Sequence, residues 1–231
     1  YEEFKFHKIM QEIVNFCTLE LGGYYLDIIK DRLYTSKKDG APRLSAQKTC
    51  HILMSYLNTW IAPILTFTAE EIYSRMPNNK ESIYLTEWFD TSVAMSDKKV
   101  KLYDNIYSIK PHVSRMIEEA RNKNEVGSSL ECELSITCNK HLYDDLSKLS
   151  DELKFVFIVS SCDIALGDES DNYLIDDHLN KFSISISKSK YKKCERCWHF
   201  HESVGTIEGS STICERCYDN VHGDGECRTY A

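Results

Sequence analysis

Two pairs of cysteines near the end of the chain constrain its structure more than any other feature. Cys194 and Cys197 form one pair, Cys214 and Cys217 form the other, and each pair encloses Glu-Arg. A gap of two residues lets a tight turn direct both sulfurs at one ion, and thiolates are strong zinc ligands. The 16 residues between the pairs fit the spacing of four-cysteine zinc sites. The sequence therefore predicts two similar Cys-Glu-Arg-Cys knuckles that hold one zinc ion from opposite sides.

The alternatives are two disulfides or ordinary buried cysteines, and His199, His201 and Cys227 are further candidate ligands. Four cysteines already fill a tetrahedral zinc shell and leave no position for an activated water. We therefore expect the zinc to be structural, with His199, His201 and Cys227 outside its shell. The segment has few apolar residues of its own, so zinc should supply most of its folding free energy.

Composition describes a globular protein, because 42% of the 231 residues are hydrophobic and 11% are aromatic. Six of the ten cysteines lie outside the two pairs without a regular framework, which indicates a reducing compartment such as the cytoplasm. The first residue is Tyr1, so we expect a segment of a longer protein. We find no signal peptide and no apolar run long enough to span a membrane, and therefore expect no membrane partner.

The net charge of −8 is concentrated in one region. Residues 144–178 hold ten acidic residues and two lysines, so the rest of the chain sums to zero. Residues 30–48 and 188–201 are each basic, with a net charge of +4. Basic faces can steer a polyanion onto one side of an acidic protein, although each could equally be ordinary solvated surface.

Residues 1–90 predict an antiparallel helical bundle. Apolar residues recur at helical spacing over 6–21, 24–34 and 50–64. We expect Gly22-Gly23 to interrupt the first of these helices and Pro63 to kink or end the third. The turn residues of 37–42 predict a loop between the second and third helices.

A fourth helix is predicted to begin near Thr68. Thr68 can act as N-cap with Glu71 at the capping-box position, while Phe67 and Ile72 have the spacing of a hydrophobic staple. Met76-Pro77-Asn78-Asn79 should end this helix.

Residues 91–187 predict a small α+β domain, followed by the zinc module at 188–231. Apolar and polar residues alternate over 130–137, which indicates a half-buried strand. The expected order is a polar linker at 90–99, a helix over 102–120 with Pro111 marking a kink or a second start, the strand at 130–137, a helix at 141–149, a central strand at 155–159 and a last strand at 182–186.

Catalytic motifs are missing from the chain. It has no Gly-rich phosphate loop, no His-Glu-x-x-His and no Gly-x-Ser-x-Gly, and paired acids such as Glu70-Glu71 suit a helix surface. We expect Arg196 and Arg216 to project outward from the knuckles. Trp198 could then stack on an unpaired base beside cations, or it could cover the metal or dock on the α+β domain; the same alternatives hold for Tyr218.

The paired knuckles, continued as Cys-Tyr-Asp-Asn-Val-His-Gly-Asp-Gly-Glu at 217–226, resemble the carboxyl terminus of bacterial-type isoleucyl-tRNA synthetases. The stretches 24–34 and 62–73 resemble the helical anticodon-binding domain of that family, and 118–131 resembles its junction domain. Together these stretches cover nearly the whole chain. Cys227 and Thr229 depart from the family, whose members tend to carry basic residues there.

The resemblance implies that the full enzyme, a monomer, activates isoleucine with ATP and Mg²⁺, charges isoleucine tRNA and hydrolyses mischarged valine. The signatures of the catalytic and editing domains are absent from this chain, so this part should grip the anticodon stem and loop, with those domains as its partners. No catalytic residue is expected here. The candidate contacts to tRNA are Lys30, Arg32, Lys192, Lys193, Arg196, Trp198 and Arg216.

Two rival functions remain open at this point. Formamidopyrimidine-DNA glycosylases end in a similar zinc finger, but they need an amino-terminal proline, and this chain begins Tyr-Glu-Glu. A zinc-ribbon module that binds protein would suit the acidic net charge but would not explain the synthetase-like helices.

Overall fold

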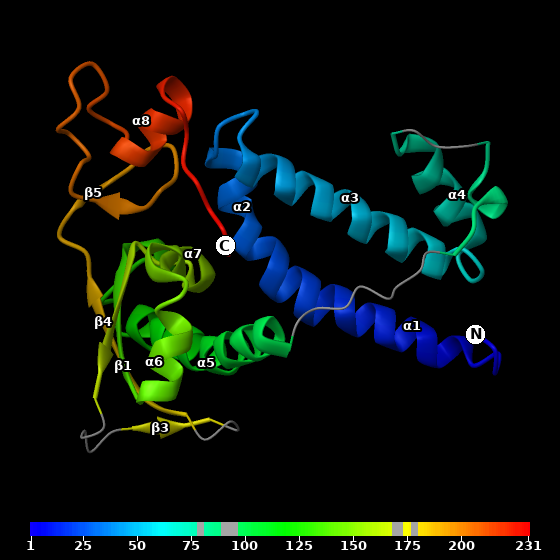
Figure 1. Ribbon diagram of the computed structural model, residues 1–231, viewed down its shortest axis with the longest axis horizontal. Helices are drawn as coiled ribbons and strands as arrows, with labels where there is room; N and C mark the ends of the chain where they lie inside the picture. The colour runs from blue at the N-terminus through cyan, green and yellow to red at the C-terminus, as the bar shows by residue number, and fades with distance from the viewer. Residues whose placement is uncertain (78–80, 89–96, 168–172, 177–179) are drawn as a thin grey trace. The chain divides into compact units, whose positions relative to one another are not determined.

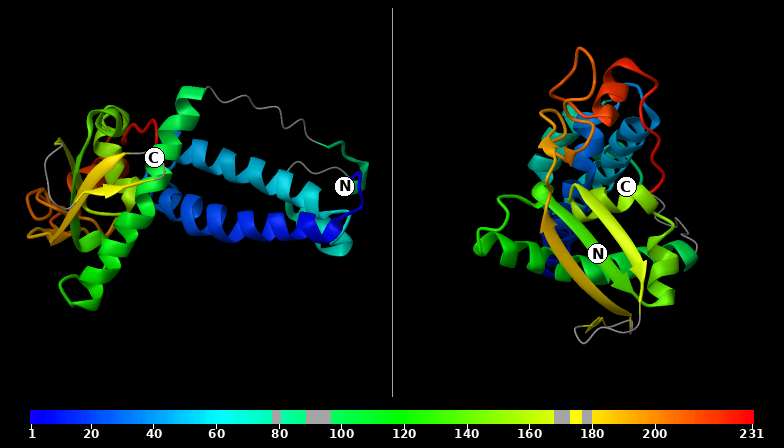
Figure 2. Two further views of the ribbon diagram at one scale, coloured as in Figure 1. Left: turned by 90° about the horizontal axis from the view of Figure 1, so that it is seen from below. Right: turned by 90° about the vertical axis from the view of Figure 1, so that its left-hand side faces the viewer.

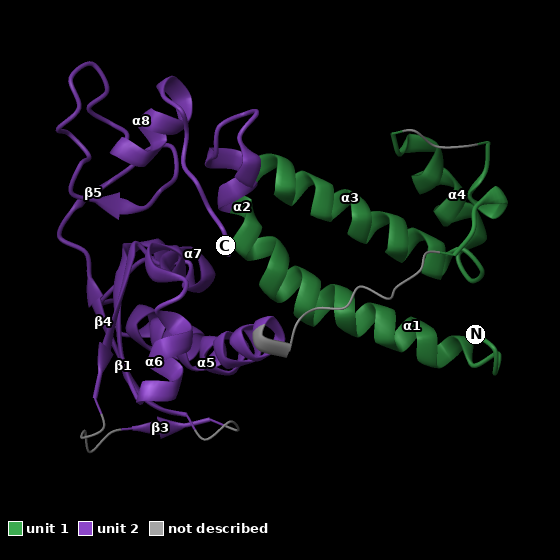
Figure 3. Cartoon of the chain, viewed as in Figure 1, with its two compact units in different colours: residues 1–30, 43–94 green, residues 31–42, 95–231 purple. Residues whose placement is uncertain are grey.

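The computed structural model describes residues 1–77, 81–88, 97–167, 173–176 and 180–231. The chain forms two compact units (Figure 3). Unit 1 consists of Tyr1–Lys30 and Arg43–Ala94, and unit 2 consists of Asp31–Pro42 and Met95–Ala231. Within the described residues, no helix combines the length and apolar composition that a membrane span requires.

One uninterrupted helix opens the chain, formed by α1 (Phe6–Asn15), the π-helical segment η1 (Phe16–Tyr25) and α2 (Leu26–Thr35) (Figure 1). The predicted interruption at Gly22-Gly23 is therefore wrong. A Cβ atom at Gly22 would lie 2.9 Å from the carbonyl oxygen of Cys17, five residues earlier. Glycine allows this close approach, so here it accommodates the wider turns of the π-helix without ending the helix.

Helix α3 (Ala41–Ile61) runs back alongside α1 and η1, as Figures 1 and 2 both show. The loop before α3 is shorter than the predicted 37–42, because Ala41 and Pro42 already belong to the first turn of α3. The helix ends two residues before Pro63, as predicted. Residues 76–77 follow α4 (Thr66–Arg75) as expected, whereas Asn78 and Asn79 lie outside the described residues.

The predicted start of α4 is wrong. The helix begins at Thr66 without a side-chain cap, so Thr68 and Glu71 lie inside it, and the side chain of Phe67 is 90% exposed. Other contacts stabilise this end of α3 and α4. The hydroxyl of Tyr84, in the 3₁₀ segment η2 (Ile83–Leu85), donates to the carbonyls of Ala62 and Thr66, each at 3.0 Å. The hydroxyl of Tyr84 thus ties the end of α3 to the start of α4.

A four-stranded sheet forms the centre of unit 2, with the strand order β2-β1-β4-β3. β1 (Cys132–Cys138) pairs in parallel with β2 (Ser161–Leu166) and antiparallel with β4 (Lys181–Lys188), which also pairs with β3 (Leu174–Ile175). Helices α5 (Asp97–Asn122), α6 (Lys140–Leu146) and α7 (Leu153–Phe157) cover one face (Figure 1). Short 3₁₀ segments, η3 (Ser129–Glu131) and η4 (Ser150–Glu152), precede β1 and α7.

The strands expected at 130–137 and 182–186 are confirmed as β1 and β4, and the helix expected at 141–149 corresponds to α6. Alternate residues of β1, including Leu134 and Ile136, are buried beneath the helices. Helix α5 runs through Pro111 as one element and begins at Asp97, so the last residues of the predicted linker are helical. The rest of that linker, up to residue 96, lies outside the described residues.

The central strand predicted at 155–159 is wrong. Leu153–Phe157 forms the helix α7, which Ile158 ends with a φ of +58°, and the unpredicted strand β2 follows. A short continuous apolar run suits a buried helix as well as a buried strand. Here Phe155, Val156 and Phe157 are all buried, so the run lies in the core in helical form.

The zinc module contains three elements that the sequence analysis did not predict. β5 (Lys192–Lys193) and β6 (Phe200–His201) form a two-stranded sheet, and α8 (Glu215–His222) follows the third cysteine. These elements belong to unit 2 together with the four-stranded sheet.

Candidate metal centre and its surroundings

The four paired cysteines meet in one buried cluster. Their sulfurs all lie within 4.8 Å of one another, and the sulfurs of Cys197 and Cys214 are 3.7 Å apart. Cys194 follows β5, Cys197 lies in the turn before β6, Cys214 is the N-cap of α8, and Cys217 lies inside α8. Sequence positions about 20 residues apart are thereby brought to one point.

The two knuckles share one backbone hydrogen bond, although the first is a turn and the second opens α8. The amide of Trp198 donates to the carbonyl of Cys194 at 2.9 Å, and the amide of Tyr218 donates to the carbonyl of Cys214 at the same distance. The amide of Cys214 also points at the sulfur of Cys194, at 3.3 Å. An amide directed at a sulfur favours the thiolate form that a metal requires.

This donor set fits a zinc ion. A tetrahedral site with Zn–S bonds of about 2.3 Å places its sulfurs about 3.8 Å apart. Among the described residues, no other group of three or more His, Cys, Asp or Glu side chains converges in this way. His199, His201 and Cys227 are not members of the cluster: His199 contacts the carbonyl of Cys197 through Nδ1, and His201 contacts Ser203.

Trp198 lies on the surface beside the centre. Its side chain is 59% exposed, and the Nζ of Lys193 lies 4.8 Å from its ring centroid. More than half of Trp198 is therefore open to solvent. Lys192 and Lys193 are exposed on β5, while Tyr218 packs against His222 with ring centroids 4.8 Å apart.

The knuckle arginines do not project outward, which corrects the prediction. The Nη1 of Arg196 donates to the carbonyl of Thr35 and lies 3.8 Å from the sulfur of Cys217. Arg216 forms a bidentate pair with Asp31, with N–O distances of 2.7 and 2.9 Å, and its side chain is only 18% exposed. Both guanidinium groups are therefore directed at the end of α2.

The remaining candidate cations lie on the opening helix. Lys30 is exposed and pairs with Asp27 at 2.5 Å, and Arg32 is half-buried. Lys30 belongs to unit 1 and Arg32 to unit 2.

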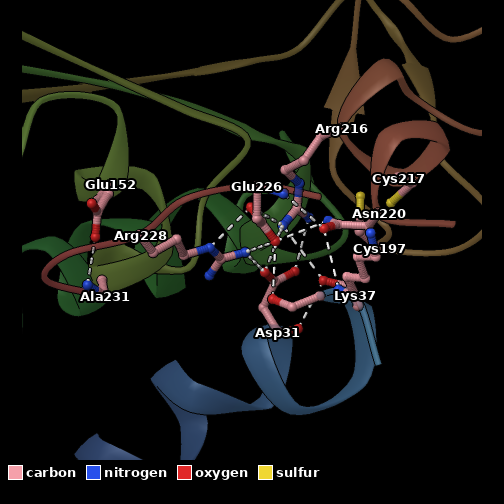
Figure 4. A network of polar contacts seen from close by, with 12 residues as sticks. Asp31, Lys37, Glu152, Cys197, Arg216, Cys217, Asn220, Glu226, Arg228 and Ala231 are labelled. Atoms are coloured by element: carbon pink, nitrogen blue, oxygen red, sulfur yellow. Dashed lines mark hydrogen bonds and ion pairs between the residues drawn. The ribbon is translucent and has the colours of Figure 1, made fainter. Parts of the chain in front are cut away.

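A buried ion network, consisting of Asp31, Arg216, Glu226 and Arg228, was missed by the sequence analysis (Figure 4). The Arg228 side chain is 1% exposed, and its guanidinium carbon lies 3.6 Å from the ring centroid of Phe155. Two acids and two arginines balance in charge, as a buried set must. Its members lie up to 197 residues apart, so no local pattern could have revealed them.

The network sets the charge state of its acids. Burial by itself would raise the pKa of Asp31, but hydrogen bonds and charges from Arg216 and Arg228 outweigh it and hold this pKa well below its usual value. Burial likewise opposes ionisation of Glu226, and the charge of Arg216 with a hydrogen bond from Arg228 lowers its pKa. Both carboxyl groups are therefore ionised at neutral pH.

Known proteins match both parts of the chain. Residues 1–136 match the family model described as the anticodon-binding domain of tRNA ligase, and residues 192–220 match a zinc finger found in FPG and IleRS. Isoleucine–tRNA ligases of Shewanella sediminis, Shewanella pealeana and Shewanella halifaxensis are 37%, 38% and 39% identical to this chain, respectively. Each alignment covers 100% of this chain, which spans a quarter (25%) of the relative's length.

The zinc-finger match by itself does not separate the ligase from the glycosylase reading, because its description includes both. The match to residues 1–136 and the relatives aligned over the whole chain decide against the glycosylase. The resemblance to isoleucyl-tRNA synthetases is thereby confirmed. Since the first family model matches more than half of its residues, the chain belongs to the anticodon-binding domain family of tRNA ligases.

Proposed function

We propose that this chain is the carboxyl-terminal part of an isoleucine–tRNA ligase and that it binds the anticodon stem and loop of isoleucine tRNA. One observation carries the proposal: an anticodon-binding match over residues 1–136 continues, in the same chain, into a four-cysteine cluster. The proposed parts are the helical anticodon-binding domain at 1–90, the α+β junction domain at 91–187 and the zinc module at 188–231.

We propose one structural zinc ion with Cys194, Cys197, Cys214 and Cys217 as its ligands. Support comes from the burial of all four sulfurs and from their mutual distances. When bound, the ion would tie β5 to α8, because each knuckle supplies two ligands. The four thiolates occupy every tetrahedral position, so the role of the ion is to hold the fold.

The proposed tRNA contacts are Lys30, Arg32, Lys192, Lys193 and Trp198. The exposed indole offers one face for base stacking, and the two lysines of β5 can pair with phosphates. The knuckle arginines are no longer in this set, because their guanidinium groups have partners within unit 2. The contact set thus combines two basic residues of α2, two of β5 and one aromatic side chain.

In the whole enzyme, the remaining three quarters would activate isoleucine with ATP and Mg²⁺ and transfer it to the tRNA. The part described here would select the tRNA and orient its acceptor end toward the catalytic domain. Its partners would be isoleucine tRNA and the enzyme's own catalytic and editing domains. We place the enzyme in the cytoplasm, as a monomer.

The test is a filter-binding titration of the full-length ligase with three RNAs: isoleucine tRNA, the same tRNA with its anticodon bases replaced, and a non-cognate tRNA. Each is titrated at two salt concentrations. We expect the natural tRNA to bind at least about tenfold more tightly than the other two, and its affinity to fall as salt rises, because phosphate contacts release counterions. Equal binding of all three RNAs, or binding insensitive to salt, would reject anticodon recognition.

A further inference from the structure

Both knuckles direct the same residue type at the same target. The third residue of each Cys-Glu-Arg-Cys is an arginine, and the two guanidinium groups meet the last turns of α2, at Thr35 and at Asp31. The second residue of each knuckle, Glu195 or Glu215, is exposed. Within one repeated motif, the acids therefore face solvent and the arginines face the helix.

Arg196 connects the metal cluster to this helix directly. Its Nη1 lies 3.8 Å from the sulfur of Cys217 and donates to the carbonyl of Thr35. A zinc ion with four thiolates has a net charge of −2, so a nearby cation stabilises the loaded centre. The same guanidinium satisfies a carbonyl at the end of α2, where helices leave carbonyls without partners.

Arg216 makes the second connection, through α8. It spans from the cluster to Asp31 with two hydrogen bonds and contacts Glu226 at 3.3 Å. The loss of one member of such a buried, balanced set leaves an uncompensated charge, which is more costly than the loss of a surface pair. The position of α8 and the position of Asp31 are therefore linked.

The turn after α2 is fastened to the zinc module as well. The amide of Lys37 donates to the Oδ1 of Asn220 at 3.2 Å, and its Nζ donates to the carbonyl of Gly223 at 2.9 Å. Gly225 has a φ of +83°, and a Cβ atom there would lie 2.9 Å from the Cβ of Lys37. Only glycine allows the tail to pass this close to the turn.

We propose that Arg196 and Arg216 are positioning residues, through which the metal centre holds the segment Asp31–Pro42 of the anticodon-binding region. These two arginines, here called the arginine clamp, act on protein and not on RNA. How rigidly the segment Asp31–Pro42 is held then depends on whether the metal centre is occupied. The inference rests on the proposed zinc ligands, but it does not require that the chain binds tRNA.

The test is hydrogen–deuterium exchange of the full-length protein, read by mass spectrometry over residues 31–42. The protein is compared with zinc bound and after zinc removal by a chelator. We expect zinc removal to speed exchange in this segment by about tenfold or more, including the amide of Lys37, while peptides from the middle of α3 change little. Equal exchange with and without zinc would overturn the inference.

Matched variants separate the clamp from general damage to the module. Arg216→Ala with zinc bound should reproduce the faster exchange of 31–42, and Glu215→Ala, one residue away, should not. Arg196→Ala should speed exchange of the same segment. It should also weaken zinc binding by the 10- to 100-fold that is typical for loss of a group in contact with a metal ligand. Glu195→Ala is the control for this variant. Identical behaviour of each arginine variant and its control would reject the clamp.

Gly225→Ala supplies an independent check, because it leaves both arginines in place. The added methyl group should push Lys37 away and speed exchange of 31–42, with one zinc still bound by metal analysis. Slow exchange in this variant would contradict the proposed fastening of the turn. A protein in which zinc removal still speeds exchange of 31–42, but which does not bind isoleucine tRNA, would reject the proposed function and leave the clamp intact.

Discussion

At the scale of single residues, the cysteines of this chain fall into chemically different groups. Cys138 is completely buried in β1, and burial raises the pKa of its thiol to about 11. At pH 8 only about one such thiol in a thousand is ionised, and the thiolate is the reactive form. Cys227 is exposed in the tail and lies outside the metal cluster.

We therefore predict that a thiol-specific alkylating reagent at pH 8 labels Cys227 quickly and leaves Cys138 unlabelled until the protein is unfolded. Peptide mass spectrometry over time distinguishes the two sites. The Cys227→Ser variant is the control, since it should lose the fast phase. Fast labelling of Cys138 in folded protein would contradict its burial in the sheet.

Cys194 tests the proposed ligand set. Serine is a much poorer zinc ligand than a thiolate, so Cys194→Ser should release the metal and unfold mainly residues 188–231. The expected signature is loss of zinc by metal analysis, with most of the helical circular dichroism retained. A variant that still holds one zinc tightly would show that the ligand set is wrong.

Trp198 tests the proposed RNA contact. A base stacked on an aromatic side chain contributes about 1–3 kcal/mol, so Trp198→Ala should weaken binding of isoleucine tRNA by about 5- to 150-fold without loss of zinc. Filter binding and metal analysis measure the two effects. Tyr218→Ala, at the equivalent position of the second knuckle, should have a smaller effect because Tyr218 packs against His222. Unchanged affinity after Trp198→Ala would give the indole a packing role.

At the scale of elements, Pro111 lies at an exposed position inside α5. Proline lacks the amide that would bond to the carbonyl four residues earlier, and its ring crowds that carbonyl. Pro111→Ala should therefore raise the free energy of unfolding of unit 2 by about 1–3 kcal/mol. Urea unfolding measures the change, and Arg115→Ala, which removes only an exposed pair with Glu119, should stay within about 0.5–1 kcal/mol of the wild type. An unchanged midpoint for Pro111→Ala would indicate that α5 already bends around the ring.

Elements with a clear periodicity could be predicted, and elements decided by tertiary contacts could not. β1 and β4 were found because their alternation follows directly from one buried face. The run at 155–159 has no alternation, so only its packing in the core decides that it forms α7. The capping box at Thr68 was wrong as well: the helix begins at Thr66 with no side-chain cap, so the local capping signal does not decide where α4 starts.

At the scale of the whole molecule, the metal ligands could be predicted but their surroundings could not. The spacing of two cysteine pairs is a local signal, whereas Arg216 and Asp31 lie 185 residues apart. The expectation that the knuckle arginines face outward treated the zinc module as a separate body. In the structure, the module and residues 31–42 belong to one compact unit, which gives those arginines partners.

This division into units predicts how the protein unfolds when zinc is removed. Trp60 and Trp88 lie in unit 1, and Trp198 is the only tryptophan of unit 2. In the isolated 231-residue chain, a Trp198→Phe variant therefore reports on unit 1 by fluorescence, and a variant with Trp60→Phe and Trp88→Phe reports on unit 2. Zinc stabilises only the state that binds it, by an amount that grows with its concentration relative to its Kd.

Chelation should move the urea midpoint of the unit 2 reporter to lower urea by at least about 1 M, since m-values of 1–3 kcal/mol/M are usual and structural zinc contributes several kcal/mol. The unit 1 reporter should move much less. Equal shifts of both reporters would mean that the two units unfold as one, and that zinc stabilises the whole chain.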